Sequence, residues 1–370
     1  MRVLVIHNEY KLHGGEDTVY IQEKEAYSAL GHEVKTLLVS NKTLSTFDLL
    51  ASLWNPRSYF VVKKLVKTFN PDIIHIHNFI FKLSPSIFWA FNKNAKVYLT
   101  IHNFRFLCPS GTLFVDRKVD LSSKTTIGLI KNIFKGVYQN SIIKTLILAS
   151  IFKVNKVIGT FKRVDKFVFL TQFSRDIHLS WNKTLFENNL VKPNFLSINL
   201  FKDQKIEFDI IFIGRMSVEK GLDSVLPVLA KQKNRTIAIV GDGPNYLRYK
   251  ENYQKHEQIS FLGPQSHKET LRLLEKSKFL LFPSIWYEVM PMTIIESFAL
   301  SKPIIAHNFG AVKSMIEHNR NGLLYENTEQ LQSILETLDN IDYAELSNNA
   351  FLEYENKYTY KEGLKNLSKL

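Results

Sequence analysis

The sequence has few cysteines and no long apolar runs, and both absences exclude classes of protein. Its 370 residues contain a single cysteine, Cys108, so an internal disulfide is impossible, and no cysteine–histidine cluster has the spacing of a zinc site. No apolar run reaches the roughly 18 residues that a membrane-spanning helix needs. The opening MRVLVIHNEY predicts a core strand rather than a signal peptide. Together these features predict a cytoplasmic protein.

Acidic residues are scarce, above all in one segment. The 48 Lys+Arg against 35 Asp+Glu give a formal net charge of +13, which favours an anionic partner such as nucleic acid, anionic lipid or a phosphorylated substrate. Segment 124–166 holds one acidic residue, Asp165. Its basic residues, interleaved with apolar ones, are Lys124, Lys131, Lys135, Lys144, Lys153, Lys156, Lys162, Arg163 and Lys166. The pattern is typical of a membrane-surface helix, but a core-facing helix with lysines on its wet side has the same pattern.

No G-x-G-x-x-G motif follows the first predicted strand, so a dinucleotide cofactor is not indicated. Buried strands alternate with helices along the whole chain, and 45% hydrophobic residues are enough for two cores. We predict two doubly wound α/β domains facing one another across a cleft, residues 1–197 and 198–355, joined by a polar linker over about 196–208. A C-terminal helix over about 356–370 is expected to pack back on the first domain.

The stretch 279–308 is the most informative part of the chain. FLLF predicts a buried parallel strand, WYEVM a loop, and Pro291 the first turn of a helix that leads to a second strand, PIIAH. The free N–H groups of such a helix start bind anions. Glu288 and Glu296 are suitable acceptors for sugar hydroxyls, so the ligand would carry both phosphate and sugar. Taken alone, the pair is equally compatible with a solvated loop residue and a surface helix residue.

This stretch resembles the signature of family 4 glycosyltransferases, retaining enzymes with the two-domain GT-B fold. The residues that carry the match are Pro283, Ser284, Glu288 and Glu296. The family usually has Gly-Phe-Gly where this sequence has Val289, Met290 and Pro291, and a glycine where it has Ala311. The resemblance implies that Glu288 and the backbone of 289–291 hold the sugar of a nucleotide-sugar donor, and that Glu296 takes its ribose hydroxyls. The departures put the sugar preference in doubt.

A second motif lies at the start of the predicted second domain. Arg215 ends the strand DIIFIGR and Lys220 follows in the loop, where the two cations can clamp a diphosphate. The resemblance extends here, since the family motif G-R-x-x-x-x-K-G falls on Gly214, Arg215, Lys220 and Gly221. Neutralisation of phosphate by these side chains is the reason to expect no metal. The alternative is that both are ordinary surface cations.

Smaller matches complete the predicted donor site. In RTIAIVGDGP, Gly243 falls on the family's G-x-G-P, and the loop after Gly263, with Pro264, is the predicted place for the nucleotide base. Gly14 and Gly15 match a G-G-x-E loop that approaches the reacting sugar in the family, because paired glycines let backbone come close to a ligand. A flexible turn would show the same two glycines.

The acceptor side is predicted around His102, at the end of the strand KVYLTIHNF. An acceptor hydroxyl needs a base, and histidine has a pKa near neutrality; the resemblance places the family's acceptor-side histidine on the same residue. His75 and His77 end the preceding strand, and we interpret both as structural residues.

We therefore predict retaining transfer of a hexosyl group from a nucleotide sugar to a hydroxyl of a cell-surface polysaccharide (capsule or lipopolysaccharide) or lipid-linked oligosaccharide. The enzyme would work without metal or cofactor on the inner face of the membrane, held through 124–166, with no nucleic-acid partner. A GT-B nucleotide-sugar 2-epimerase is one alternative. A basic, non-catalytic nucleic-acid- or membrane-binding protein is another, although no nucleic-acid-binding motif is present. The sequence does not specify the base, the sugar, the acceptor or the oligomeric state.

Overall fold

The computed structural model describes residues 1–9, 14–197 and 205–370. His13 of the predicted glycine loop and most of the predicted linker lie outside these ranges. The chain divides into two compact units, Met1–Val115, Val119–Asn194 and Gly363–Leu370 forming the first, and Asp116–Lys118 and Phe195–Glu362 the second. The predicted boundary after residue 197 lies close to this division. Of the predicted returning helix, residues 363–370 cluster with the first unit, where Tyr98 donates to the carbonyl of Leu370.

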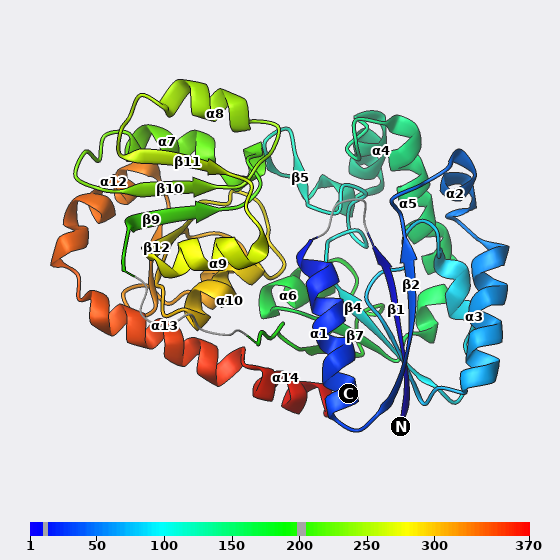
Figure 1. The fold of residues 1–370 in the computed structure, drawn as a ribbon. Helices are drawn as coiled ribbons and strands as arrows, with labels where there is room; N and C mark the ends of the chain where they lie inside the picture. Colours follow the sequence, from blue (N-terminus) through cyan, green and yellow to red (C-terminus); the bar gives the residue numbers. More distant parts are fainter. Residues whose placement is uncertain (10–13, 198–204) are drawn as a thin grey trace. The chain divides into compact units, whose positions relative to one another are not determined.

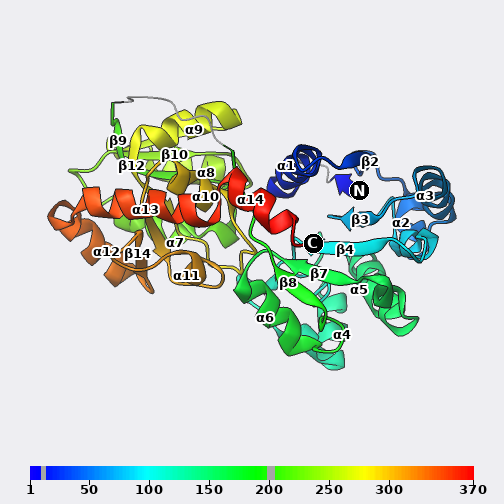
Figure 2. The ribbon, with the colours of Figure 1, turned by 90° about the horizontal axis from the view of Figure 1, so that it is seen from below.

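The first unit is built on a six-stranded parallel sheet in the order β2-β1-β3-β4-β7-β8 (Figure 1). Its strands are β1 (Arg2–Glu9), β2 (Glu33–Ser40), β3 (Ile73–Ile76), β4 (Lys96–Ile101), β7 (Lys166–Phe169) and β8 (Asn189–Val191). Its helices are α1 (Gly15–Ala29), α2 (Thr46–Ala51), α3 (Pro56–Phe69), α4 (Thr126–Phe134), α5 (Ile142–Val157) and α6 (Gln172–Trp181). Figure 2 shows α1 on one face of this sheet and α3 and α5 on the other.

Local sequence explains where these helices begin. Asn55 caps α3 by accepting from two first-turn N–H groups, and Pro56 follows at the position where its missing N–H costs nothing. Thr171 caps α6 through the N–H of Ser174. α1 begins at Gly15, because the Asp17 carboxylate accepts from the N–H of Gly14 at 2.8 Å and holds the helix start there.

The second unit repeats the architecture, with a six-stranded parallel sheet in the order β11-β10-β9-β12-β13-β14. Its strands are β9 (Phe208–Ile213), β10 (Ile237–Val240), β11 (Ile259–Gly263), β12 (Ser277–Phe282), β13 (Ile304–His307) and β14 (Gly322–Tyr325). Its helices are α7 (Leu222–Leu229), α8 (Tyr246–Tyr253), α9 (His267–Glu275), α10 (Met292–Ala299), α11 (Val312–Met315), α12 (Thr328–Thr337), α13 (Tyr343–Lys357) and α14 (Tyr360–Leu367), the last reaching into the first unit's residues. A short hairpin, β5 (Phe114–Val115) and β6 (Lys118–Val119), stands apart from both sheets.

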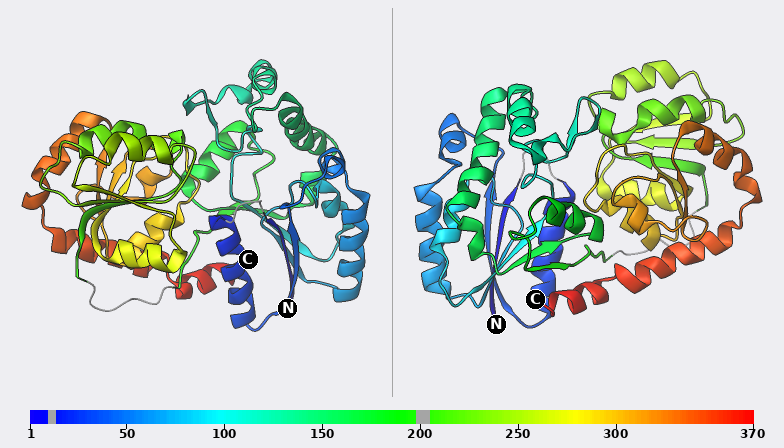
Figure 3. Two further views of the ribbon diagram at one scale, coloured as in Figure 1. Left: turned by 45° about the horizontal axis from the view of Figure 1, so that its top comes forward. Right: turned by 180° about the vertical axis from the view of Figure 1, so that it is seen from behind.

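Helices cover both faces of each sheet, α7 and α8 on one side of the second sheet and α9 and α10 on the other (Figures 1 and 3). The strand order of the second sheet reverses between β9 and β12, since β10 and β11 extend to one side and β13 and β14 to the other. Open α/β sheets bind ligands at such a switch point, outside the carboxyl ends of the strands. The prediction of two doubly wound α/β domains is confirmed.

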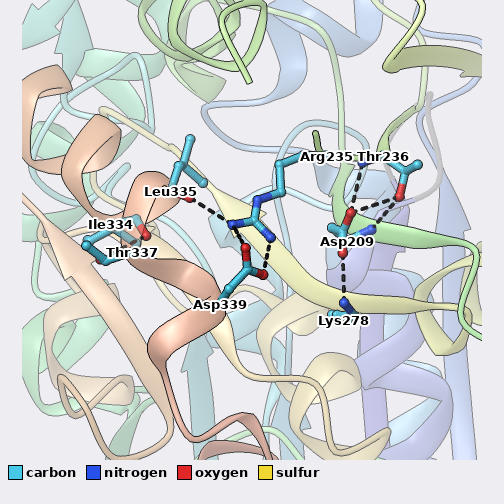
Figure 4. A network of polar contacts seen from close by, with 8 residues as sticks. All are labelled: Asp209, Arg235, Thr236, Lys278, Ile334, Leu335, Thr337 and Asp339. Atoms are coloured by element: carbon cyan, nitrogen blue, oxygen red, sulfur yellow. Dashed lines mark hydrogen bonds and ion pairs between the residues drawn. The ribbon is translucent and has the colours of Figure 1, made fainter. Parts of the chain in front are cut away.

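Polar networks close the opposite, amino-terminal ends of these strands (Figure 4). Asp209 of β9 accepts from the N–H of Thr236, just before β10, at 2.9 Å and from Nζ of Lys278 in β12 at 2.9 Å. Arg235 donates to both carboxylate oxygens of Asp339, at 2.6 and 2.8 Å. The paired hydrogen bonds connect the start of β10 with the turn after α12.

At the carboxyl ends of the same strands, backbone packs directly on backbone. A Cβ on Gly241, which follows β10, would lie 2.0 Å from the carbonyl oxygen of Gly214, which follows β9. A Cβ on Gly221 would lie 2.0 Å from the carbonyl oxygen of Pro283, which follows β12. Both glycines have positive φ, 130° and 77°. The loops that follow β9, β10 and β12 can therefore pack this closely because these glycines have no side chains.

Replacing Gly241 by alanine should thus destabilise the second unit. The added Cβ would lie 2.0 Å from the carbonyl oxygen of Gly214, and the φ of 130° strains any L-residue. We expect Gly241→Ala to lower the free energy of unfolding by about 1–3 kcal/mol, measured by urea denaturation. Gly214→Ala is the matched control, because its Cβ would lie in ordinary contact, 3.4 Å from Phe212. Equal stability of the two variants would contradict the close packing.

Candidate donor and acceptor sites

The predicted cations lie at the switch point of the second sheet. Gly214 and Arg215 follow β9 directly, and Lys220 ends a short 3-10 turn, Val218–Lys220. Arg215 is exposed and pairs with no carboxylate in the part of the chain that the structure describes. Gly243 lies beside them, since a Cβ there would be 2.7 Å from the backbone N of Met216. Arg215, exposed, and Lys220, in an ion pair described next, therefore border this strand end.

Lys220 and Glu288, 68 residues apart in the chain, form an ion pair. Lys220 Nζ lies 2.7 Å from Glu288 Oε1, and the two side chains are 21% and 10% exposed. The ammonium also lies over the ring of Trp286, 5.2 Å from its centroid. Burial of this degree reduces solvent screening, so the pair is a fixed feature of the site rather than a transient surface contact.

Glu288 receives three hydrogen bonds on the same oxygen. Besides Lys220, Trp286 Nε1 donates to Oε1 at 2.6 Å and Ser284 Oγ donates at 3.1 Å. The matched Ser284 thus has a role that the sequence did not specify, as it orients the carboxylate. With Oε1 saturated, the second oxygen, Oε2, remains as an acceptor for a ligand hydroxyl.

The helix that follows begins without a cap. Pro291, extended at φ −74° and ψ 120°, takes the N-cap position of α10 and has no side chain that can accept from the first turn. Val289 and Met290 lie in the preceding loop, and Met290 is buried. The first turn of α10 contains no acidic residue, so its first N–H groups carry the partial positive charge of a helix start.

Glu296 has a partner that sequence reasoning missed. Its Oε1 lies 2.8 Å from Nε2 of His267, the first residue of α9. This hydrogen bond raises the pKa of His267 above 6.5. α9 directly follows the loop that holds Pro264, which was predicted to receive the nucleotide base. The sequence signal that could have identified His267 is its position, directly after the capping serine Ser266 and close to the carboxyl end of a strand.

The other predicted residues belong to the first unit. Gly14 is the N-cap of α1 and Gly15 its first residue, and a Cβ on Gly14 would meet nothing within 4 Å. His102 follows β4 and is half-buried, with Nε2 3.1 Å from Nδ1 of His77. The site residues therefore form two groups, a donor group in the second unit and these three residues in the first.

The pKa expected for His102 is wrong. Burial, followed by the charges of His7 and Lys192, lowers the pKa of His102 well below 6.5, so the ring is neutral at pH 7. His75 is buried and bonded through both nitrogens, to Tyr27 at 3.0 Å and Thr100 at 2.7 Å, as a structural residue would be.

The family of sequences described as "Glycosyl transferases group 1" matches residues 198–355, which contain every donor-side residue of the second unit. The match lies in the second unit, and the chain is a glycosyltransferase. This glycosyltransferase is similar to several curated proteins. It is 26% identical over 330 residues to an "Uncharacterized 41.2 kDa protein in cps region" of Klebsiella pneumoniae, covering 86% of this chain and 79% of that protein.

Two further relatives match over less than half of this chain. The "Uncharacterized glycosyltransferase MJ1178" of Methanocaldococcus jannaschii is 28% identical over 157 residues, 41% of this chain and 44% of its own length. The "O-antigen biosynthesis glycosyltransferase WbnH" of Escherichia coli is 28% identical over 128 residues, 34% of this chain and 36% of its own. The chain thus spans less than half the length of these two relatives.

Solved structures agree on the fold of the whole glycosyltransferase. The Anabaena protein Alr3699/HepE, crystallised in complex with UDP, superposes with a TM-score of 0.68 at 15% identity, covering 100% of this chain and 99% of its own. At this identity the likeness concerns the fold, and it confirms the GT-B class.

The basic segment 124–166 of this glycosyltransferase covers α4, α5 and a 3-10 turn. Both helices bury one side, with Leu129, Leu148 and Ile151 in the core. They also expose apolar residues, namely Ile127, Ile130, Phe134, Ile142, Ile143, Leu146, Val154 and Val157. In the described ranges, no helix is both long and apolar enough to cross a membrane. Cys108 is buried and accepts weakly from Ser110 and Ser123.

The Glu296–His267 pair gives a pH prediction. The pKa of His267 is raised in the folded protein, so the pair stabilises the fold fully below about pH 6.5 and this contribution is lost as pH rises through the raised pKa. In Glu296→Gln the pKa of His267 should fall toward 6.5, measured by NMR titration of the ring. The wild-type His267 curve, recorded under the same conditions, is the reference. An unchanged His267 curve would contradict the contact.

Proposed function

We propose that the protein is a retaining hexosyltransferase that moves a sugar from a nucleotide-sugar donor to an acceptor hydroxyl. The arrangement at the switch point of the second sheet carries the proposal: the exposed Arg215, the Lys220–Glu288 pair and the uncapped start of α10. Cations and helix N–H groups suit the diphosphate, and the remaining carboxylate oxygens suit sugar hydroxyls. This combination matches both halves of a nucleotide sugar.

Each donor-side residue then has a role that follows from its contacts. Lys220 gives one N–H to Glu288 and keeps the others for a phosphate, while the exposed Arg215 is available for bidentate binding. These two positive charges balance the leaving diphosphate, so we propose that no metal is required. Glu288 accepts a sugar hydroxyl on Oε2, and Glu296, held by His267, accepts the ribose hydroxyls.

We propose that the acceptor is a cell-surface polysaccharide or a lipid-linked oligosaccharide bound on the first unit beside His102. The names of the relatives support this choice, one for O-antigen biosynthesis and one for a cps region. The UDP complex of the structural neighbour favours a uridine nucleotide as the first donor to test.

The first experiment is a thermal shift panel of UDP-, GDP-, ADP- and CMP-sugars, without added metal. Ligand binding raises the melting temperature by mass action, and a free ligand at 100 times its Kd adds about 2.7 kcal/mol of stability. We expect a shift with one nucleotide class in the wild type and none in Glu296→Ala. A shift that needs a divalent cation would refute metal independence.

Lys220→Met is the variant that tests the phosphate contact. Lys250→Met is the control, because Lys250 is an exposed lysine of α8 that is not among the predicted site residues. The first should abolish the shift and the second preserve it. Product analysis with a glycan acceptor separates transfer from epimerisation, because an epimerase changes the donor sugar without any acceptor. Absence of a shift with every nucleotide sugar would refute the proposed function.

We also propose that α4 and α5 bind the inner face of the membrane, which would keep the cytoplasmic enzyme beside a lipid-linked acceptor. The two helices pack against each other. Their exposed apolar side chains include Ile127, Phe134 and Ile143, which are 70%, 71% and 68% exposed. The interleaved lysines complement anionic lipid, and each is worth about 1 kcal/mol near a charged surface.

Flotation with liposomes containing anionic lipid tests this surface. The wild type should float with anionic vesicles, remain behind with neutral ones, and be released by salt. The triple variant Ile127→Ser, Phe134→Ser, Ile143→Ser should lose binding. Leu247→Ser, which replaces an equally exposed apolar residue in the second unit, should retain it. Equal flotation of all three proteins would refute the surface.

A further inference from the structure

The first unit contains a buried cluster of histidines that the proposed transfer does not yet use. His7 lies on β1, His75 on β3 and His77 just after it, and His102 follows β4, so they come from three adjacent strands. His7 and His75 are fully buried and His77 is 3% exposed, while His102 is half-buried. Burial and the neighbouring positive charges lower the pKa of His77 well below 6.5, so this ring too is neutral.

One buried ion pair lies against these rings. Glu23 of α1 is fully buried, and its Oε1 contacts the ammonium of Lys192, itself 1% exposed. Its other oxygen, Oε2, lies 3.4 Å from Nδ1 of His75 and 3.6 Å from Nε2 of His77. Glu23 Oε2 and His77 Nε2 have no hydrogen-bond partner in the described chain, and each is the other's near polar neighbour at 3.6 Å.

These donor atoms do not suit a metal, although those of Glu23, His75 and His77 lie within 4.8 Å of one another. The ammonium of Lys192 already balances the carboxylate, and both nitrogens of His75 are engaged by Tyr27 and Thr100. A divalent cation would have to break one of these bonds and lie beside an ammonium. The ammonium of Lys192 already takes the place of a cation beside Glu23. We therefore interpret the cluster as a network of polar side chains rather than a metal site.

The network determines where the protons of the rings lie. A neutral imidazole has one N–H, and in His77 a lone pair on Nε2 would face the negative Oε2 of Glu23, so Nε2 carries the proton. Nδ1 of His77 is then an acceptor. It lies 3.1 Å from Nε2 of His102, which must therefore donate. The lone pair of His102 is left on Nδ1, which has no hydrogen-bond partner among the described residues.

We propose that Glu23, acting through His77, sets the tautomer of His102 so that His102 Nδ1 accepts a hydrogen bond from the acceptor hydroxyl. Glu23 and His77 are positioning residues in this scheme, and only His102 touches substrate. The substrate part rests on the proposed function, while the tautomer does not. A weakly basic nitrogen orients a hydroxyl without becoming protonated in the resting enzyme.

The isosteric change Glu23→Gln makes an unusual prediction. Lys192 has only donors, so the new amide must turn its oxygen toward the ammonium and its NH₂ toward His77. His77 then accepts on Nε2 and carries its proton on Nδ1, which donates to Nε2 of His102. Both tautomers invert, and His102 presents an N–H where the wild type presents a lone pair. In the double variant Glu23→Gln, Lys192→Met the amide is free to turn back.

The measurement is long-range ¹H–¹⁵N NMR of ¹⁵N-histidine-labelled full-length protein, which distinguishes Nδ1–H from Nε2–H. His102→Gln and His77→Gln spectra assign the signals. We expect Nε2–H for both rings in the wild type, Nδ1–H for both in Glu23→Gln, and the wild-type pattern again in the double variant. A wild-type His102 in the Nδ1–H form would overturn the inference without any variant having to fold, as would unchanged tautomers in a folded Glu23→Gln protein.

Kinetics then test the link to catalysis. Glu23→Gln should lower kcat about 10²-fold at unchanged KM for the donor, the order of a lost proton-accepting group, and the double variant should recover most of it. A purely structural role would leave the double variant, with two changed core residues, no better than the single one, and that result would overturn the catalytic part. If no donor supports transfer, the proposed function fails while the NMR result still decides the tautomer.

Discussion

The close contact of backbone with backbone at the carboxyl ends of β9, β10 and β12 is the constraint on which the donor site depends. Side chains there would separate the loops, and Gly221 and Gly241 keep them together. The loop after β9 carries Arg215 and Lys220, and the loop after β12 carries Glu288. The close packing of these two loops places Lys220 within ion-pair distance of Glu288. These glycines therefore act through loop packing.

The charges of the site are arranged so that few of them need to move. Glu288 is held on one oxygen by an ammonium, an indole and a hydroxyl, and Glu296 is held by His267. Side chains fixed before ligand binding lose little rotamer entropy when the ligand arrives. Arg215 differs, since it is exposed and unpaired in the described chain, and it is the side chain that ligand binding would order.

In the first unit, a charged pair, Glu23 and Lys192, is buried in the core. Placing a carboxylate and an ammonium in a core is costly unless each is paired, and Glu23 and Lys192 pair with one another. The surrounding histidines remain neutral because a further positive charge would not be solvated there. In a neutral ring one nitrogen donates and the other accepts, because the single proton occupies one nitrogen or the other. In such an environment the tautomer, rather than the charge, is the variable that the protein controls.

Local patterns in the sequence were enough to predict the alternation of buried strands and helices, the two doubly wound domains, and the motifs around Arg215, Lys220, Glu288 and Glu296. Strand burial, helix caps and glycine turns depend on neighbouring residues, so they can be recognised without the fold. The tertiary structure alone decided which residues meet. It paired Glu296 with His267, gave Ser284 to Glu288, and surrounded His102 with buried neighbours that lower its pKa. These outcomes depend on distances and burial between segments far apart in the chain, which residue type and spacing do not contain.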